Sequence, residues 1–187
     1  MDVASKKVEL IKLLSAVEDE AVLSRVENAL KEKGEENFVI NENEFWHLIS
    51  KVDWNESMNQ KKIQPLIESL VTYPESSIVT FYDLLSEKLF LLDQEKFAKE
   101  LEKKNKHFSS DEFLYARCAV VAKGKNYFDQ VVSNEVIFPA NLYLEDLLEV
   151  PEQAFKMKTG NDLDHLPIYI FETGFNPEGW GDKTVEL

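Results

Sequence analysis

Apolar residues recur at intervals of three and four along most of this 187-residue chain, which is the spacing that places them on one face of an α-helix. One such stripe consists of Phe45, Leu48, Ile49 and Val52. The stretch at 77–92, SIVTFYDLLSEKLFLL, is apolar on almost every side and predicts a central helix packed against several neighbours. Only Ile168 to Phe171 resemble an extended segment. The pattern therefore predicts an all-α protein with a compact multi-helix domain.

Turn signals and composition divide the chain into three predicted parts. Residues 1–34 read as a helical hairpin, residues 41–160 as a helical core domain, and residues 161–187 as an irregular, aromatic tail that packs on the core. Two short helices cannot bury their apolar faces alone. The hairpin is therefore expected to dock on its own core, to bind a partner, or to form a homo-oligomer through residues 6–33.

The stretch from Ser109 to Val132 contains the most informative charged residue. Ser109 or Ser110 caps a predicted helix that ends at Gly124, and Arg117 lies on or beside its buried face. A buried guanidinium without a carboxylate partner is costly. We therefore predict that Arg117 belongs to a structural polar network, the other members being Ser110 and two acids of the central helix, Asp83 and Glu87.

The same stretch allows a functional interpretation, in which a polar pocket is formed by Asp111, Glu112, Tyr115 and Arg117. Such a pocket would suit a small hydrolase or a ligand-binding protein. However, a serine followed by acids in the first turn is also what a helix start requires, because these groups pair with free backbone N–H groups and the helix dipole. The structural interpretation is therefore preferred, and no catalytic residue is assigned.

Charge and cysteine content limit the possible partners. Lysine and arginine number 21 against 35 acidic residues, a formal charge of −14, which disfavours binding to nucleic acid or to an anionic membrane surface. Such acidity is common in proteins where it serves solubility alone, and its natural electrostatic complement is a basic protein partner. Cys118 is the single cysteine, and three scattered histidines form no zinc motif, so we predict no disulfide, metal or cofactor. Without a leader or a membrane span in the sequence, a cytoplasmic protein is expected.

Three segments resemble, in order, the bacterial domain-of-unknown-function family four-two-four-zero: FWHLISKVDW (Phe45 to Trp54), SSDEFLYARCAVVAKGKNYF (Ser109 to Phe128) and AFKMKTG (Ala154 to Gly160). The resemblance covers about Asn41 to Gly160. Its patterned positions fall on Ser110, Asp111, Phe113, Tyr115, Arg117, Gly124 and Phe128, with departures at Glu112, Ala116 and Ala119. The family implies a helical fold without an established activity. The N-terminal hairpin in turn resembles that of small antitoxins from bacterial toxin–antitoxin modules.

Together these features favour a non-enzymatic, acidic protein-interaction protein with an immunity-like or regulatory role. Two alternatives stay open: a small hydrolase or ligand-binding protein that uses the predicted polar pocket, and a regulatory oligomer assembled through the N-terminal hairpin.

Overall fold

The computed structural model describes residues 3–17, 19–20, 22–24, 26, 39–104 and 106–181, which fall in two compact units, Met1–Phe38 and Val39–Leu187. In the first unit, α1 spans Val3–Ser15. Residues 20, 22–24 and 26 are also helical. The rest of the predicted second helix of the hairpin, including Gly34, lies outside the described residues.

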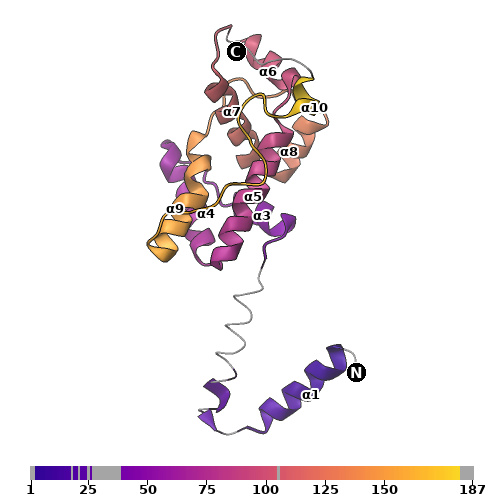
Figure 1. Ribbon diagram of the computed structural model, residues 1–187, viewed down its shortest axis with the longest axis vertical. Helices are drawn as coiled ribbons and strands as arrows, with labels where there is room; N and C mark the ends of the chain where they lie inside the picture. The colour runs from indigo at the N-terminus through magenta and orange to yellow at the C-terminus, as the bar shows by residue number, and fades with distance from the viewer. Residues whose placement is uncertain are drawn as a thin grey trace. The chain divides into compact units, whose positions relative to one another are not determined.

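The second unit consists of helices joined by turns and longer loops (Figure 1). They are α3 (Glu42–Ile49), α4 (Asn59–Val71), α5 (Glu75–Leu91), α6 (Glu95–Glu102), α7 (Ser110–Ala122), α8 (Lys125–Val132), the 3-10 helix η1 (Glu145–Glu149), α9 (Val150–Thr159) and α10 (Pro177–Trp180). The structure assigns no strand to any residue that it describes. The all-α prediction is confirmed, and the segment from Ile168 to Phe171 lies against helices without strand pairing.

The central helix α5 packs against α3, α7 and α9, as its apolar sequence predicts. Its Phe81 is fully buried and lies 5.1 Å from the ring of Phe45 on α3, measured between centroids. Phe113 of α7 is also fully buried and contacts the ring of Trp180 edge-on at 6.2 Å. Burial of these aromatic side chains stabilises the fold, because each removes a large apolar area from water.

Side-chain caps determine where several helices begin and end. The Asn41 carboxamide accepts the backbone N–H groups at the start of α3. Ser109 and Glu112 form a reciprocal capping box at the start of α7, which satisfies backbone donors that the helix leaves free. Gly160 ends α9 with φ of 77°, a left-handed conformation that favours glycine.

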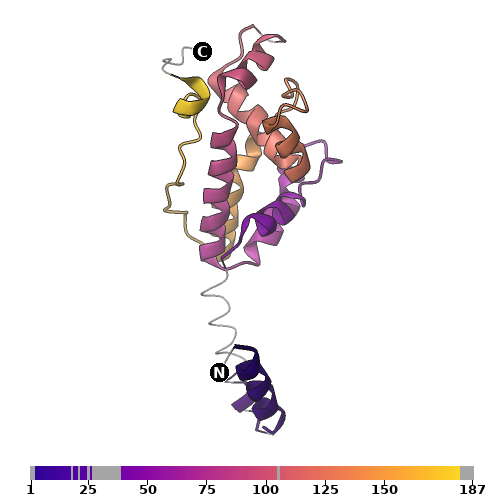
Figure 2. The same ribbon diagram turned by 90° about the vertical axis from the view of Figure 1, so that its right-hand side faces the viewer.

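After α9 the chain turns back and runs along α5 to reach α10, which lies beside α6 (Figures 1 and 2). We call residues 161–181 the C-terminal strap. Its backbone has no strand partner, so side chains of α5 accept its N–H groups. The Asp83 carboxylate accepts from Ile168 N at 3.1 Å, and the Ser86 hydroxyl accepts from Tyr169 N at 3.4 Å.

Candidate functional site

Arg117 is fully buried between α5, α7 and the C-terminal strap. Its Nη1 donates to the Leu89 carbonyl of α5 at 3.0 Å, and its Nη2 donates to the Thr173 hydroxyl of the strap at 3.0 Å. The guanidinium also lies 4.8 Å from the Phe113 ring centroid. Burial lowers the pKa of Arg117, and the field of Asp93 opposes this shift. The side chain therefore joins two helices and the strap.

The carboxylate beside Arg117 belongs to Asp93, which lies just after α5 and is fully buried; the two side chains approach to 3.9 Å. Asp93 also accepts backbone N–H groups of Gly174 and Asn176, at 3.0 to 3.1 Å, and the Trp180 indole N–H at 2.8 Å. Buried charges need this kind of compensation. The Arg117–Asp93 centre is thus a structural anchor for the strap.

The predicted network residues Asp83 and Glu87 make other contacts. The Asp83 carboxylate lies 2.8 Å from the His165 ring nitrogen, in addition to its bond to the strap backbone. Glu87 pairs with the neighbouring Lys88 at 3.3 Å. Ser110 contributes its carbonyl, which accepts from the Thr173 hydroxyl at 2.8 Å. Thr173 therefore connects Ser110 to Arg117, whereas both acids bind elsewhere.

The residues of the predicted polar pocket are divided between the interior and the surface of the protein. Arg117 has no solvent-exposed surface, and the Glu112 carboxylate accepts the Ser109 N–H in the capping box. Asp111 is exposed, and Tyr115 is partly buried against the core. Asp111 and Tyr115 thus reach the surface, while Arg117 faces the interior.

Near Tyr115 and Tyr82 the surface is acidic. Partial burial raises the pKa of both phenols; the next causes for Tyr115 are Asp111 and Glu145, and those for Tyr82 include Glu152. The charge of Glu172, on the strap, also raises the pKa of both phenols. All of these acids are exposed, and none forms an ion pair with another residue in the described part of the chain. We call this region the acidic–aromatic surface; it comprises Tyr82, Asp111, Tyr115, Glu145, Glu152 and Glu172.

Next to this surface, the strap exposes large apolar side chains. Leu166 is 90% exposed, Ile168 71% and Ile170 56%. On the inner side, Phe171 lies 6.4 Å from the Tyr82 ring and Tyr169 lies 5.2 Å from the Phe90 ring, measured between centroids. Apolar side chains at alternate positions thus remain in water beside unpaired carboxylates.

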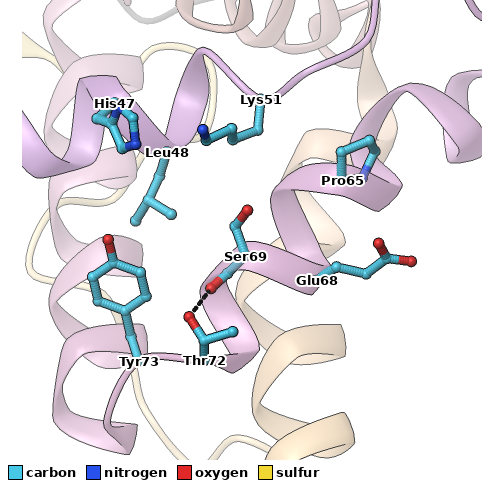
Figure 3. Close-up of a pocket in the computed structure, with 8 residues that line it drawn as sticks. All are labelled: His47, Leu48, Lys51, Pro65, Glu68, Ser69, Thr72 and Tyr73. Atoms are coloured by element: carbon cyan, nitrogen blue, oxygen red, sulfur yellow. Dashed lines mark hydrogen bonds between the residues drawn. The ribbon is translucent and has the colours of Figure 1, made fainter.

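A pocket with a volume of about 500 Å³ opens between α3 and α4. Figure 3 shows His47 and Lys51 on one side of it, Ser69, Thr72 and Tyr73 on the other, and Leu48 between them. The Thr72 hydroxyl donates to the Ser69 carbonyl at 2.7 Å. This pocket was not predictable from the sequence, because the lining residues from α4 follow His47 by 18 residues or more and form no motif with it.

Asp93 and its strap partners were also missed. Asp93 follows directly after an apolar helix, where an acid reads as a turn residue. The start of α10 is predictable from the tail sequence Asn176-Pro177-Glu178-Gly179, because Asn before Pro is typical of a helix start. In the structure Asn176 caps α10 by accepting from Gly179 N.

In the described parts of the chain, no three histidine, cysteine or acidic side chains come together as metal ligands would. None of the helices described is long and apolar enough to cross a membrane.

Comparison with known proteins identifies a family but no characterised relative. The family model described as "Protein of unknown function (DUF4240)" matches residues 40–157, which include α3 to η1, most of α9 and both members of the Arg117–Asp93 centre. No curated protein and no solved structure matches the chain. Because the match covers well over half of the 187 residues, the chain belongs to this family of proteins of unknown function.

Proposed function

We propose that this protein is a non-enzymatic interaction protein that binds a basic protein partner through the acidic–aromatic surface. The observation that carries the proposal is the group of exposed carboxylates on this surface, which lack ion-pair partners among the described residues. Lysine or arginine side chains of a partner would neutralise them. Such pairing favours fast association and correct orientation.

The aromatic and apolar groups nearby supply the remaining requirements of an interface. Tyrosine rings have a polar tip and a broad apolar face, and they also attract cations. Leu166, Ile168 and Ile170 add exposed apolar area that a partner would remove from water. A basic partner with an apolar centre therefore complements this face better than a purely ionic one.

The enzymatic alternative has less support. A pocket built on Asp111, Glu112, Tyr115 and Arg117 needs an accessible guanidinium, but Arg117 is fully buried and bonded to α5 and the strap. Glu112 is engaged in the capping box. Arg117 and Glu112 therefore each have a structural role that explains their positions.

The test compares affinity capture by the wild-type protein and by the triple variant Glu145→Gln, Glu152→Gln, Glu172→Gln. Glutamine keeps the shape of glutamate and removes the charge. Bound proteins are identified by mass spectrometry, and the affinity of a purified partner is then measured at two salt concentrations. We expect a basic protein that the triple variant binds at least tenfold more weakly.

A matched control makes the same charge change on other elements, with Glu56→Gln, Glu102→Gln and Glu135→Gln. The control is expected to bind the partner as the wild-type protein does. Equal loss of affinity in both triple variants would mean that net charge alone, and not the acidic–aromatic surface, causes the effect. Capture of an acidic partner, or of a basic partner that ignores both variants, would contradict the proposal.

A second candidate is the regulatory oligomer, which the N-terminal helix favours. On α1, the residues Val8, Leu10, Ile11 and Leu13 are 48 to 63% exposed, so the described part of the first unit does not bury the apolar side chains of this helix. Helices of this length are marginal alone. Light scattering of the full chain and of a chain lacking residues 1–34 tests it: an unchanged oligomeric state would reject this candidate.

A further inference from the structure

We infer that the pocket between α3 and α4 binds a small organic anion, a molecule with a carboxylate or phosphate group on an apolar body. This site is separate from the acidic–aromatic surface and does not depend on the proposed function. Its volume of about 500 Å³ is typical of small-molecule sites, which span roughly 300–1,000 Å³.

Unused hydrogen-bond donors determine the charge of the ligand. Among the described residues, the Lys51 ammonium, the His47 ring and the Ser69 hydroxyl form no hydrogen bond or ion pair with another side chain. An ammonium group has three donors and no acceptor, so its complement is an oxygen-rich, negatively charged group. The chain has 35 acidic residues, yet Lys51 pairs with none of the described ones. Its charge is therefore available to a ligand.

Two acids, Glu68 in the pocket lining and Glu44 beside Tyr73, determine where the anionic group lies. Figure 3 shows the Glu68 carboxylate directed away from the other lining side chains, and it accepts from Gln64 at 3.0 Å. Glu44 accepts a hydrogen bond from the Tyr73 hydroxyl at 3.3 Å, so a negative charge lies beside the Tyr73 end of the pocket. Burial and Glu44 raise the pKa of Tyr73, so its hydroxyl stays protonated. The oxyanion is therefore expected between Lys51 and Ser69, away from Tyr73.

The apolar lining explains why the ligand is organic. Leu48 lies between the two polar walls, and Pro65 also lines the pocket (Figure 3). A water molecule or a bare ion occupies about 30 Å³ of liquid, far less than this volume. An aromatic or aliphatic body on the anion would fill the remaining space against Leu48 and Pro65.

The plainer interpretation is that Lys51 offsets the dipole at the end of α3, which ends at Ile49. That role predicts a small change in stability and no ligand. The two interpretations differ in one measurement, which is saturable binding that depends on Lys51.

The experiment is a titration of the full-length protein, followed by amide NMR shifts at constant ionic strength. The probes are phenyl phosphate, benzoate, inorganic phosphate and the neutral benzyl alcohol. We expect saturable shifts at Leu48, Lys51 and Ser69 with phenyl phosphate or benzoate, at least tenfold weaker binding of inorganic phosphate, and none of benzyl alcohol. Whichever of the first two binds more tightly identifies the anionic group.

Variants decide whether the site is the pocket. Lys51→Met is expected to weaken binding at least tenfold, whereas Lys61→Met removes the same charge from an exposed position on α4 and is expected to leave it unchanged. Ser69→Ala gives a second test if Lys51→Met fails to fold. The inference is overturned if neither organic anion gives saturable shifts, if benzyl alcohol binds equally well, or if Lys61→Met has the effect expected of Lys51→Met.

Discussion

The buried charges of Arg117 and Asp93 are costly by themselves and favourable only as a complete set. Arg117 uses two of its three guanidinium nitrogens, and its Nε has no hydrogen-bond partner among the described residues. An unsatisfied buried donor costs about 1–3 kcal/mol. The fold tolerates this cost because Asp93 and Thr173 fix the strap through the same group.

Replacing Arg117 by leucine is expected to lower the free energy of unfolding by about 3 kcal/mol, the low end for a broken buried pair, since Asp93 keeps its three N–H donors. Urea denaturation measures it. As a control, Lys99→Leu removes a cation from an exposed i,i+4 pair with Glu95 and is expected to change stability by less than about 0.5 kcal/mol. An unchanged free energy for Arg117→Leu would exclude a stabilising ion pair.

Cys118 offers a residue-level prediction on pH. Burial raises the pKa of its thiol from 9.0 to about 12, against the opposing field of Arg117. Below pH 9 both states keep the proton; above it the unfolded chain loses the proton while the native state retains it. Stability from this group is therefore lost as pH rises from about 9 towards 12. Cys118→Ala is expected to flatten this alkaline decline in urea unfolding curves.

The thiol also reports on opening of the core. At neutral pH we expect labelling by a disulfide reagent to be slow in native protein and rapid in denaturant. Rapid native labelling at neutral pH would contradict the burial and pKa assigned to Cys118.

At the scale of elements, the close approach of α10 to the end of α5 depends on Gly179. A Cβ at this position would lie 2.3 Å from the backbone carbonyl oxygen of Asp93. Because this oxygen belongs to the backbone, no change of side-chain rotamer can relieve the contact. Gly179→Ala is expected to displace α10 and to cost about 1–3 kcal/mol, as overpacking does. The indole N–H resonance of Trp180, which donates to Asp93, would shift.

The matched control for this prediction is Glu178→Ala, an exposed position on the same short helix. It is expected to keep the Trp180 resonance and to change stability by less than about 0.5 kcal/mol. If Gly179→Ala behaves in the same way, the contact between α10 and Asp93 is not rigid.

Helix periodicity allowed the all-α fold and the central helix to be predicted, because each apolar stripe is a local pattern. The same holds for the cap of α7, which Ser109 and Glu112 encode within four residues. The partner of Arg117 was not predictable in this way. Asp93 is 24 residues from Arg117 and Thr173 is 56 residues away, so packing alone brings them together. The pocket beside Lys51 likewise has no local signal.

At the scale of the whole molecule, the family match and the folded unit do not end at the same residue. The match ends at residue 157, yet Thr173, Gly174, Asn176 and Trp180 complete the contacts of the buried charges inside it. The strap is therefore part of the folding unit, and the matched segment alone leaves Asp93 without its three N–H donors and Arg117 without the Thr173 hydroxyl.

A chain that ends at Gly160 tests this dependence. Without the strap, Asp93 loses three N–H donors and Arg117 loses the Thr173 hydroxyl, and burying either charge then costs several kcal/mol. We expect a lower melting temperature and a smaller urea m-value than in the full chain, because water reaches the region around Phe113 and Trp180 no longer covers it. A synthetic peptide of residues 161–187, added in excess, is expected to raise the melting temperature again, and a scrambled peptide is not. If the truncated chain unfolds with the free energy of the full chain, the strap is only a surface attachment, and the buried charges are stabilised within α5 and α7 alone.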